Sequence, residues 1–147
     1  MSHPDDLAIE RTTDLEMDHD RLWSLISTSD GWKSWLVDDT DVVVAPDANG
    51  SATSDGVERS VQIESVTAGR TVEFSWWRRE DPSSASYVQL DLVALPEGRS
   101  QLRITERFLG ATTTATAGAT KSHTAGVSWE VRILSLWLMA AQSSVMA

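Results

Sequence analysis

The sequence predicts an α+β domain in which a curved antiparallel sheet of about six or seven strands wraps on a long C-terminal helix. Three observations predict this class. Residues 57–109 form runs of alternating apolar and polar side chains separated by short turns, which is typical of an antiparallel meander. Residues 20–36 place apolar side chains at helical spacing. Residues 127–141 are apolar enough to cover the face that a meander must bury.

The N-terminal part predicts one strand and two short helices. Residues 7–13 alternate apolar and polar, so they predict a strand. Asp18 is the expected N-cap of a helix. Residues 29–31 interrupt the helical pattern, and a second short helix follows. The apolar positions of the two helices are Leu22, Trp23, Leu25, Ile26, Trp32, Trp35 and Leu36. We expect Trp23 and Trp35 to point into one core.

The middle of the chain predicts the sheet. A β-branched run at 42–44 ends at Pro46, and the turn-rich segment 47–56 leaves room for one short strand near 51–53. The four expected strands that follow are 57–66, 71–79, 86–95 and 101–109, joined by turns at 68–69, 80–83 and 96–98. Short connections of this kind indicate that neighbouring strands pair in sequence order.

The last part combines a simple loop with a helix. Residues 110–126 consist mainly of threonine and small residues, so they can bury little apolar area and predict a flexible, lid-like loop. We expect the helix at 127–141 to pack over a broad apolar face. The prediction is therefore a single domain over 1–147, with a core of about 7–141. A cavity between such a sheet and its helix is where a small ligand would bind.

The composition excludes several classes of protein. The 147 residues include 22 acids and 12 bases, which gives a formal charge of −10 and a pI near 4.6. This balance argues against binding to nucleic acid or to an anionic membrane. Cysteine is absent, so no disulfide or thiolate chemistry is available. The polar N-terminus and the lack of a long apolar run predict a cytoplasmic protein without membrane insertion.

The acidic surplus lies in the first 60 residues, which hold 14 acids and 4 bases, whereas residues 61–147 hold 8 of each. A solvated acidic face is the simpler interpretation. A cation site around Asp38, Asp39 and Asp41 is the alternative, but these residues lack the glycine and distal glutamate of a calcium loop. The histidines, His3, His19 and His123, do not share metal-ligand spacing. We therefore expect no metal and no cofactor.

The order of these elements and their local amino-acid sequences resemble the START-like (SRPBCC, helix-grip) superfamily. The likeness is to the bacterial branch similar to the C-terminal domain of the activator of Hsp90 ATPase. It rests on segments at 20–36 (DRLWSLISTSDGWKSWL), 55–77 (DGVERSVQIESVTAGRTVEFSWW) and 126–138 (GVSWEVRILSLWL), and on the pair SYVQLDL and SQLRITERF. The resemblance implies the helix-grip fold. It does not settle function, since this fold hosts lipid carriers, hormone receptors, aromatase/cyclases and proteins without a known ligand.

Glu106 is the carboxylate with the most unusual expected place. Alternation puts it on the same inward face as Leu102, Ile104 and Phe108, and a buried carboxylate is costly unless it is paired. Arg78, two strands away, is within reach of it. A structural Glu106–Arg78 pair is one interpretation. The other is a polar anchor, or an acid/base group, inside a cavity.

The seven tryptophans are the second candidate feature. Trp76, Trp129 and Trp137 take expected inward positions, whereas Trp77 alternates outward. Plain core packing and a ring-lined pocket both remain open, because buried indoles need hydrogen-bond partners and large rings pack with gaps.

We therefore expect a protein that binds a small hydrophobic or aromatic ligand between the sheet and the last helix. The expected site residues are Trp32, Trp35, Phe74, Trp76, Arg78, Val88, Leu90, Ile104, Glu106, Trp129, Ile133 and Trp137. One alternative is a polyketide cyclase/dehydratase-like enzyme with Glu106 as acid or base, so whether a reaction is catalysed stays open. Another is a chaperone-associated or stress-response interaction module. A homodimer through Trp77 or an edge strand is also left open.

Overall fold

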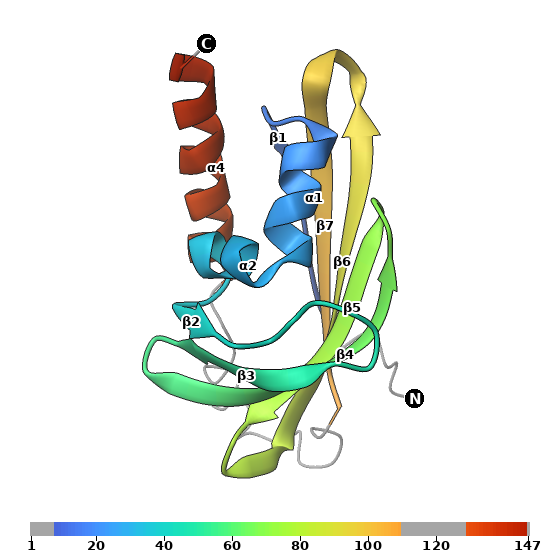
Figure 1. The fold of residues 1–147 in the computed structure, drawn as a ribbon, viewed down its shortest axis with the longest axis vertical. Coiled ribbons are helices and arrows are strands. Elements are labelled where there is room, and N and C mark those ends of the chain that lie inside the picture. Colours follow the sequence, from blue (N-terminus) through green and yellow to red (C-terminus); the bar gives the residue numbers. More distant parts are fainter. Residues whose placement is uncertain (1–7, 110–128, 147) are drawn as a thin grey trace.

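The computed structural model describes residues 8–109 and 129–146. Within them the chain forms one curved sheet, with two short helices between its first two strands in sequence and a long helix after its last strand (Figure 1). The elements are β1 (Ala8–Leu15), α1 (His19–Ser27), α2 (Ser29–Trp35), β2 (Asp39–Thr40), β3 (Asn49–Ser54), β4 (Val57–Thr67), β5 (Thr71–Arg78), β6 (Asp81–Leu95), the 3₁₀ turn η2 (Pro96–Gly98), β7 (Arg99–Phe108) and α4 (Trp129–Met146).

The seven strands have the order β1-β7-β6-β5-β4-β3-β2, and every neighbouring pair is antiparallel. The meander from β2 to β7 follows the sequence order, and β1 adds to its far edge. The sheet curls, so that β3 crosses the lower part of Figure 1 while β6 and β7 run along its height. This confirms the predicted α+β class and the helix-grip architecture.

The two short helices form where the sequence predicts them, and the start of the first is capped as expected. The Asp18 side chain accepts a hydrogen bond from the Arg21 N–H at 2.9 Å. Thr28 ends α1 and caps α2, because its Oγ1 accepts from the Gly31 N–H at 2.9 Å. Residues 29–31, which were expected to interrupt the helical pattern, therefore form the start of α2. A Cβ at Gly31 would lie 2.3 Å from the Ser24 carbonyl oxygen, so only glycine allows the helices to pack this closely.

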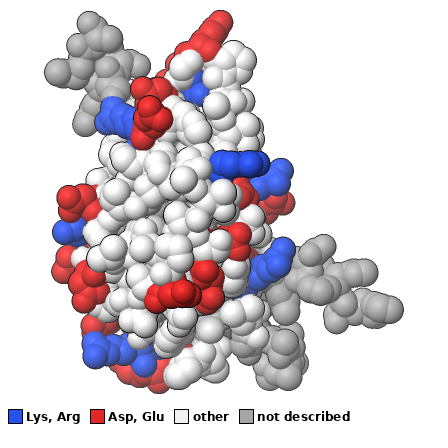
Figure 2. All heavy atoms as spheres, turned by 45° about the vertical axis from the view of Figure 1, so that its right-hand side comes forward, with Lys and Arg blue, Asp and Glu red and all other residues white. Residues whose placement is uncertain are grey.

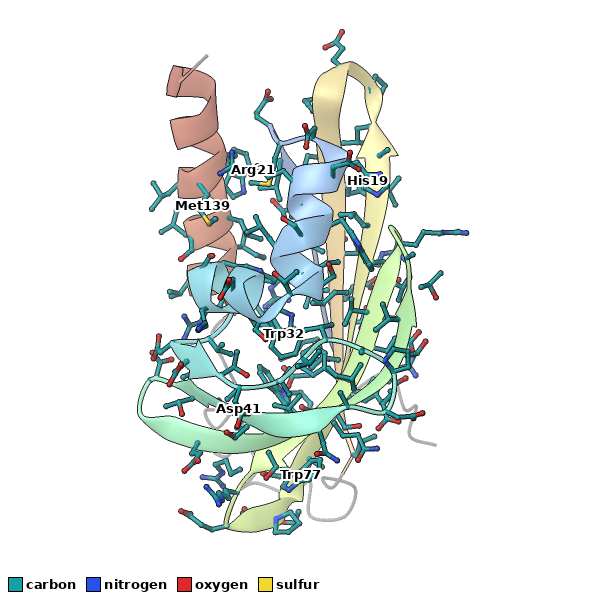
Figure 3. All side chains as sticks on the ribbon, viewed as in Figure 1. His19, Arg21, Trp32, Asp41, Trp77 and Met139 are labelled. Carbon is teal, nitrogen blue, oxygen red and sulfur yellow. The ribbon has the colours of Figure 1, made fainter. Side chains whose placement is uncertain are left out.

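The core lies between the concave face of the sheet and the helices, where Trp32 is drawn in Figure 3. Trp32 donates to the Ile26 carbonyl at 2.8 Å and Trp35 to the Leu25 carbonyl at 2.9 Å. Both indoles are thus buried with their N–H groups satisfied. Trp35 points inward as expected, and Trp23 is only partly buried against the same core.

Two local features differ from what the sequence pattern alone indicates. The β-branched run at 42–44 forms no strand, and the short strand β2 (Asp39–Thr40) ends before it. The turn expected at 80–83 is shorter, because β6 already begins at Asp81 and Arg78 stands opposite Asp81 in the register. A Pro82 at the beginning of a strand, beside a β-bulge, does not have to end the pairing.

The helix α4 covers the sheet with a narrower face than expected. Its buried positions are Trp129, Arg132, Leu136 and Ala140, and its exposed large apolar residues are Val131, Leu134, Trp137 and Leu138. The inward position expected for Trp137 was therefore wrong, since this side chain is 47% exposed and donates to Thr13 on β1 at 2.9 Å. Apolar residues occur almost all round α4, so periodicity does not fix its rotation.

Some expectations fall outside the described residues, namely the lid-like loop at 110–126 together with His3 and His123. Among the helices that are described, none is long and apolar enough to cross a membrane.

The outer side of the sheet carries a polar network. Acidic side chains are spread over the face drawn in Figure 2 in several small groups around uncharged areas. On β6, the Tyr87 hydroxyl donates to Glu73 on β5. On β5, Ser75 donates to Glu64 at 2.8 Å. Trp77 lies on this side, half-buried and opposite Ser60. Burial of Tyr87, followed by its hydrogen bond to Glu73, raises the pKa of the phenol to about 12.

Tyr87 is the one tyrosine of the chain, so its ionisation is measured directly by tyrosinate absorbance. We expect a midpoint near 12 in the folded protein and near the ordinary pKa of about 10 in denaturant. Because the pKa of Tyr87 is higher in the folded protein than in the unfolded chain, the protonated phenol stabilises the folded state. This contribution to the free energy of unfolding is complete below about pH 10 and is lost as the pH rises through the folded pKa. Glu73→Gln should lower the folded midpoint. A folded midpoint near the denatured one, with circular dichroism unchanged, would contradict this environment.

Candidate functional site

A continuous series of aromatic rings leads from α2 across the sheet to α4. The centroids of Trp32 and Phe74 are 4.7 Å apart, those of Phe74 and Trp76 are 5.1 Å apart, and Trp76 stacks with Trp129 at 6.5 Å. All four side chains are buried. The rings therefore fill this level of the interior by contact with one another, as the core-packing interpretation expects.

The ring series ends at Glu106 on β7, which is 1% exposed. Its Oε1 accepts from the Trp129 indole at 2.9 Å, and its Oε2 accepts from the Trp76 indole at 3.3 Å and from the Ser86 hydroxyl at 2.5 Å. Two tryptophans that sequence analysis placed inward thus supply the polar partners that this carboxylate needs. The prediction that Glu106 points into the interior is confirmed.

Arg59 on β4 is a buried cation that sequence analysis missed. It is 4% exposed, and its guanidinium lies 5.1 Å from the centroid of the Trp76 ring. Burial lowers the pKa of Arg59 and the charges of Arg78 and Arg132 lower it further, whereas the charges of Glu106 and Asp55 oppose this shift. The alternation Arg59, Val61, Ile63 was the signal that could have placed it inward. An arginine in an otherwise apolar stripe is easily taken for the strand's exposed end.

Arg78 does not form the expected pair with Glu106. Its Nη2 lies 3.0 Å from an Oδ2 of Asp81, in a half-exposed ion pair across the β5–β6 hairpin. The early start of β6 explains the difference, because it places Asp81 opposite Arg78 in the register. The Nε of Arg78 is nevertheless buried, on the same face of β5 as Trp76.

Arg132 ties α4 to the acidic first half of the chain. This residue is 9% exposed, and its guanidinium lies 3.4 Å from Asp55 and 3.8 Å from Asp38. Asp38 also accepts from the Asp55 N–H at 2.8 Å, and Asp41 accepts from the Ser51 N–H at 2.8 Å. These aspartates thus shape the β2–β4 edge. In the part of the chain that the structure describes, no group of three acidic or histidine side chains could hold a metal ion.

The structure brings most of the predicted site residues together in the core next to Glu106. The fully buried ones are Trp32, Trp35, Phe74, Trp76, Val88, Leu90, Ile104 and Trp129. Ile133 is partly buried, Arg78 is half-buried with its ion pair outside, and Trp137 is exposed. We call Ser54, Arg59, Arg78 and Glu106 of the sheet, together with Arg132 of α4, the polar end. Contact of any of these residues with a ligand stays a prediction.

The arrangement favours anchoring over proton transfer. A general acid or base must reach the proton that it transfers, whereas both oxygens of Glu106 already accept hydrogen bonds from protein donors. The buried Nε groups of Arg78 and Arg132, by contrast, have no acceptor among the described residues. The polar end is therefore suited to orient a polar group rather than to exchange a proton with it.

Comparison with known proteins supports the fold. No protein-family model and no curated protein matches the sequence, whereas many solved structures match the fold. A protein from Mesorhizobium loti, MLL2253, is similar with a TM-score of 0.72 and 17% identity, covering 92% of this chain and 97% of that one. An Aha1 dimer from Colwellia psychrerythraea is similar with a TM-score of 0.70 and 16% identity, and the match covers 90% of this chain and 95% of that one. An HSP90 activator from Plasmodium falciparum is similar with a TM-score of 0.62 and 14% identity, and the match covers 82% of this chain and 86% of that one. The chain thus has the START-like, helix-grip fold that the resemblance implied.

Glu106→Gln tests the hydrogen bonds around the buried carboxylate. The amide keeps the shape of the side chain but offers one acceptor oxygen, so at least one indole N–H of Trp76 or Trp129 loses its acceptor. We expect the free energy of unfolding to fall by about 1–3 kcal/mol in urea denaturation. Glu80→Gln, in the exposed β5–β6 turn, is the matched control and should have little effect. Equal stability of the two variants would show that the three contacts do not hold Glu106.

Proposed function

We propose that the protein binds a small molecule with an apolar body and one polar end, held between the concave face of the sheet and the start of α4. The observation that carries the proposal is the polar end itself. Three charged residues, Arg59, Glu106 and Arg132, are at most 9% exposed there. Buried charges contribute little to stability compared with apolar residues of similar size. Recognition of a polar ligand group is the role that we assign to them.

The same geometry limits where the ligand lies. Trp32, Phe74 and Trp76 contact one another in the deeper part of the core. A ligand would therefore lie at the polar end, with Trp76 and Trp129 as its apolar contacts, rather than among the deeper rings. This narrows the expected ligand site to fewer residues than sequence analysis named. The cyclase-like alternative is weaker, because Glu106 is already engaged by three donors.

Two tryptophans of α4 provide the test. Trp129→Phe removes the indole that touches Glu106, whereas Trp137→Phe makes the same change at an exposed position of the same helix. We expect saturable quenching of tryptophan fluorescence by at least one member of a panel of fatty acids, alcohols, a sterol, a flavonoid and an aromatic polyketide. Affinity should fall about tenfold in Trp129→Phe, as expected for one lost contact, and stay unchanged in Trp137→Phe. Absence of saturable binding in a folded protein would overturn the proposal.

Self-association is the second candidate function, and the exposed apolar face of α4 (Val131, Leu134, Trp137 and Leu138) favours it. Large apolar side chains that gather on one exposed face mark interaction surfaces. The Colwellia protein that shares the fold is a dimer. We propose that two copies of this chain pair through their α4 helices, each covering the apolar face of the other.

Analytical ultracentrifugation over a range of protein concentrations tests the dimer. Leu134→Glu places a charge in the centre of the exposed apolar face, so it should convert a dimer into a monomer. Ser135→Glu, the next residue on the helix and only partly exposed, is the neighbouring control and should change the sedimentation much less. A wild-type protein that sediments as a monomer at every concentration would exclude this assembly.

A further inference from the structure

Positively charged side chains gather at the polar end. Among the described residues, the buried charged residues are Arg59, Arg132 and Glu106, and Arg78 stands opposite Arg59 in the strand register. Three arginines thus lie close to one buried carboxylate, and a further negative charge would lower the repulsion among them.

Buried hydrogen-bond donors are also left over at this place. The Ser54 hydroxyl, on a residue that is 1% exposed, and the Nε groups of Arg78 and Arg132 have no hydrogen-bond partner among the described residues. Buried polar atoms of folded proteins almost always have one. Three such donors in one region thus indicate a missing acceptor.

The strand register places these donors around one point. Arg59 on β4 stands opposite Arg78 on β5 and opposite Ala52 on β3, two residues before Ser54 and on the same face. Arg132 reaches the region from α4, since its guanidinium lies 3.4 Å from Asp55, the residue after Ser54. Ser54, Arg78 and Arg132 thus surround Arg59, whose pKa responds to the charges of both other arginines.

The carboxylates near these donors do not meet the need. Both oxygens of Glu106 are taken by Trp76, Trp129 and Ser86. Asp38 and Asp55 pair with the Nη atoms of Arg132 at 3.8 and 3.4 Å and leave its Nε without an acceptor. Like charges on directly paired strand positions, as for Arg59 and Arg78, are unfavourable. A bound anion would relieve this repulsion.

We propose that Ser54, Arg78 and Arg132 bind the carboxylate head of a monoanionic ligand whose apolar part contacts Trp76 and Trp129. The inference rests on the proposed function and names the ligand class, namely carboxylic acids with an apolar body. A carboxylate supplies the acceptor oxygens that these buried donors lack, and guanidinium groups donate to carboxylates in favourable geometry.

Calorimetric titration with decanoate and with 1-decanol separates the head group from the apolar body, because the two probes share one alkyl chain. We expect decanoate to bind about tenfold more tightly, as a charge-assisted hydrogen bond supplies. Ser54→Ala and Arg78→Gln should remove this preference, because the affinity for decanoate falls to about that for 1-decanol. Arg103→Gln, which removes an exposed arginine paired with Glu10 on the outer side, should keep the preference.

The outcomes distinguish the two proposals. Equal affinities of the wild-type protein for decanoate and 1-decanol would overturn the carboxylate site and leave the proposed binding function standing. A preference for decanoate that persists in both Ser54→Ala and Arg78→Gln would place the anion elsewhere and overturn the inference as well. No binding of either probe by folded protein would contradict both proposals.

Discussion

The buried carboxylate of Glu106 is the interaction on which the interior of this protein depends. Its three donors come from three different elements, namely Trp76 on β5, Ser86 on β6 and Trp129 on α4. A carboxylate that is 1% exposed is stable in the core only when hydrogen bonds offset the cost of its burial. The requirement fixes the orientation of both indoles, and through Trp129 it fixes where α4 begins on the sheet.

The first turn of α4 is held from both edges of the sheet as well as from its centre. Glu130 forms an ion pair with Arg11 on β1, with 2.6 Å between Nε and Oε2, and Arg132 faces Asp38 and Asp55 near β2. The strands β1 and β2 are the two edge strands. The acidic surplus in the first part of the chain thus has a structural role at this edge, where aspartates accept backbone N–H groups and meet the arginine of the helix.

The fold followed from sequence because its signals are local. Alternation fixed the strands from β4 to β7, and Asp18 fixed the start of α1. The site was less predictable, because its contacts depend on register and rotation. Glu106 and Trp129 were placed inward correctly, whereas the partner of Arg78 depended on where β6 begins. The outward position of Trp137 depended on the rotation of a helix that is apolar on several sides. Arg59 was missed because a lone cation at a strand end gives no sign that it is covered.

Hydrogen exchange of the indole protons, measured by NMR with Trp→Phe variants for assignment, reports whether Glu106 is sealed in the interior. We expect the Nε1 protons of Trp76 and Trp129, which donate to a buried carboxylate, to exchange far more slowly than that of Trp137, which donates to Thr13 at the surface. Exchange of Trp76 and Trp129 at the rate of Trp137 would contradict this expectation, because Glu106 would then not be sealed between the sheet and α4.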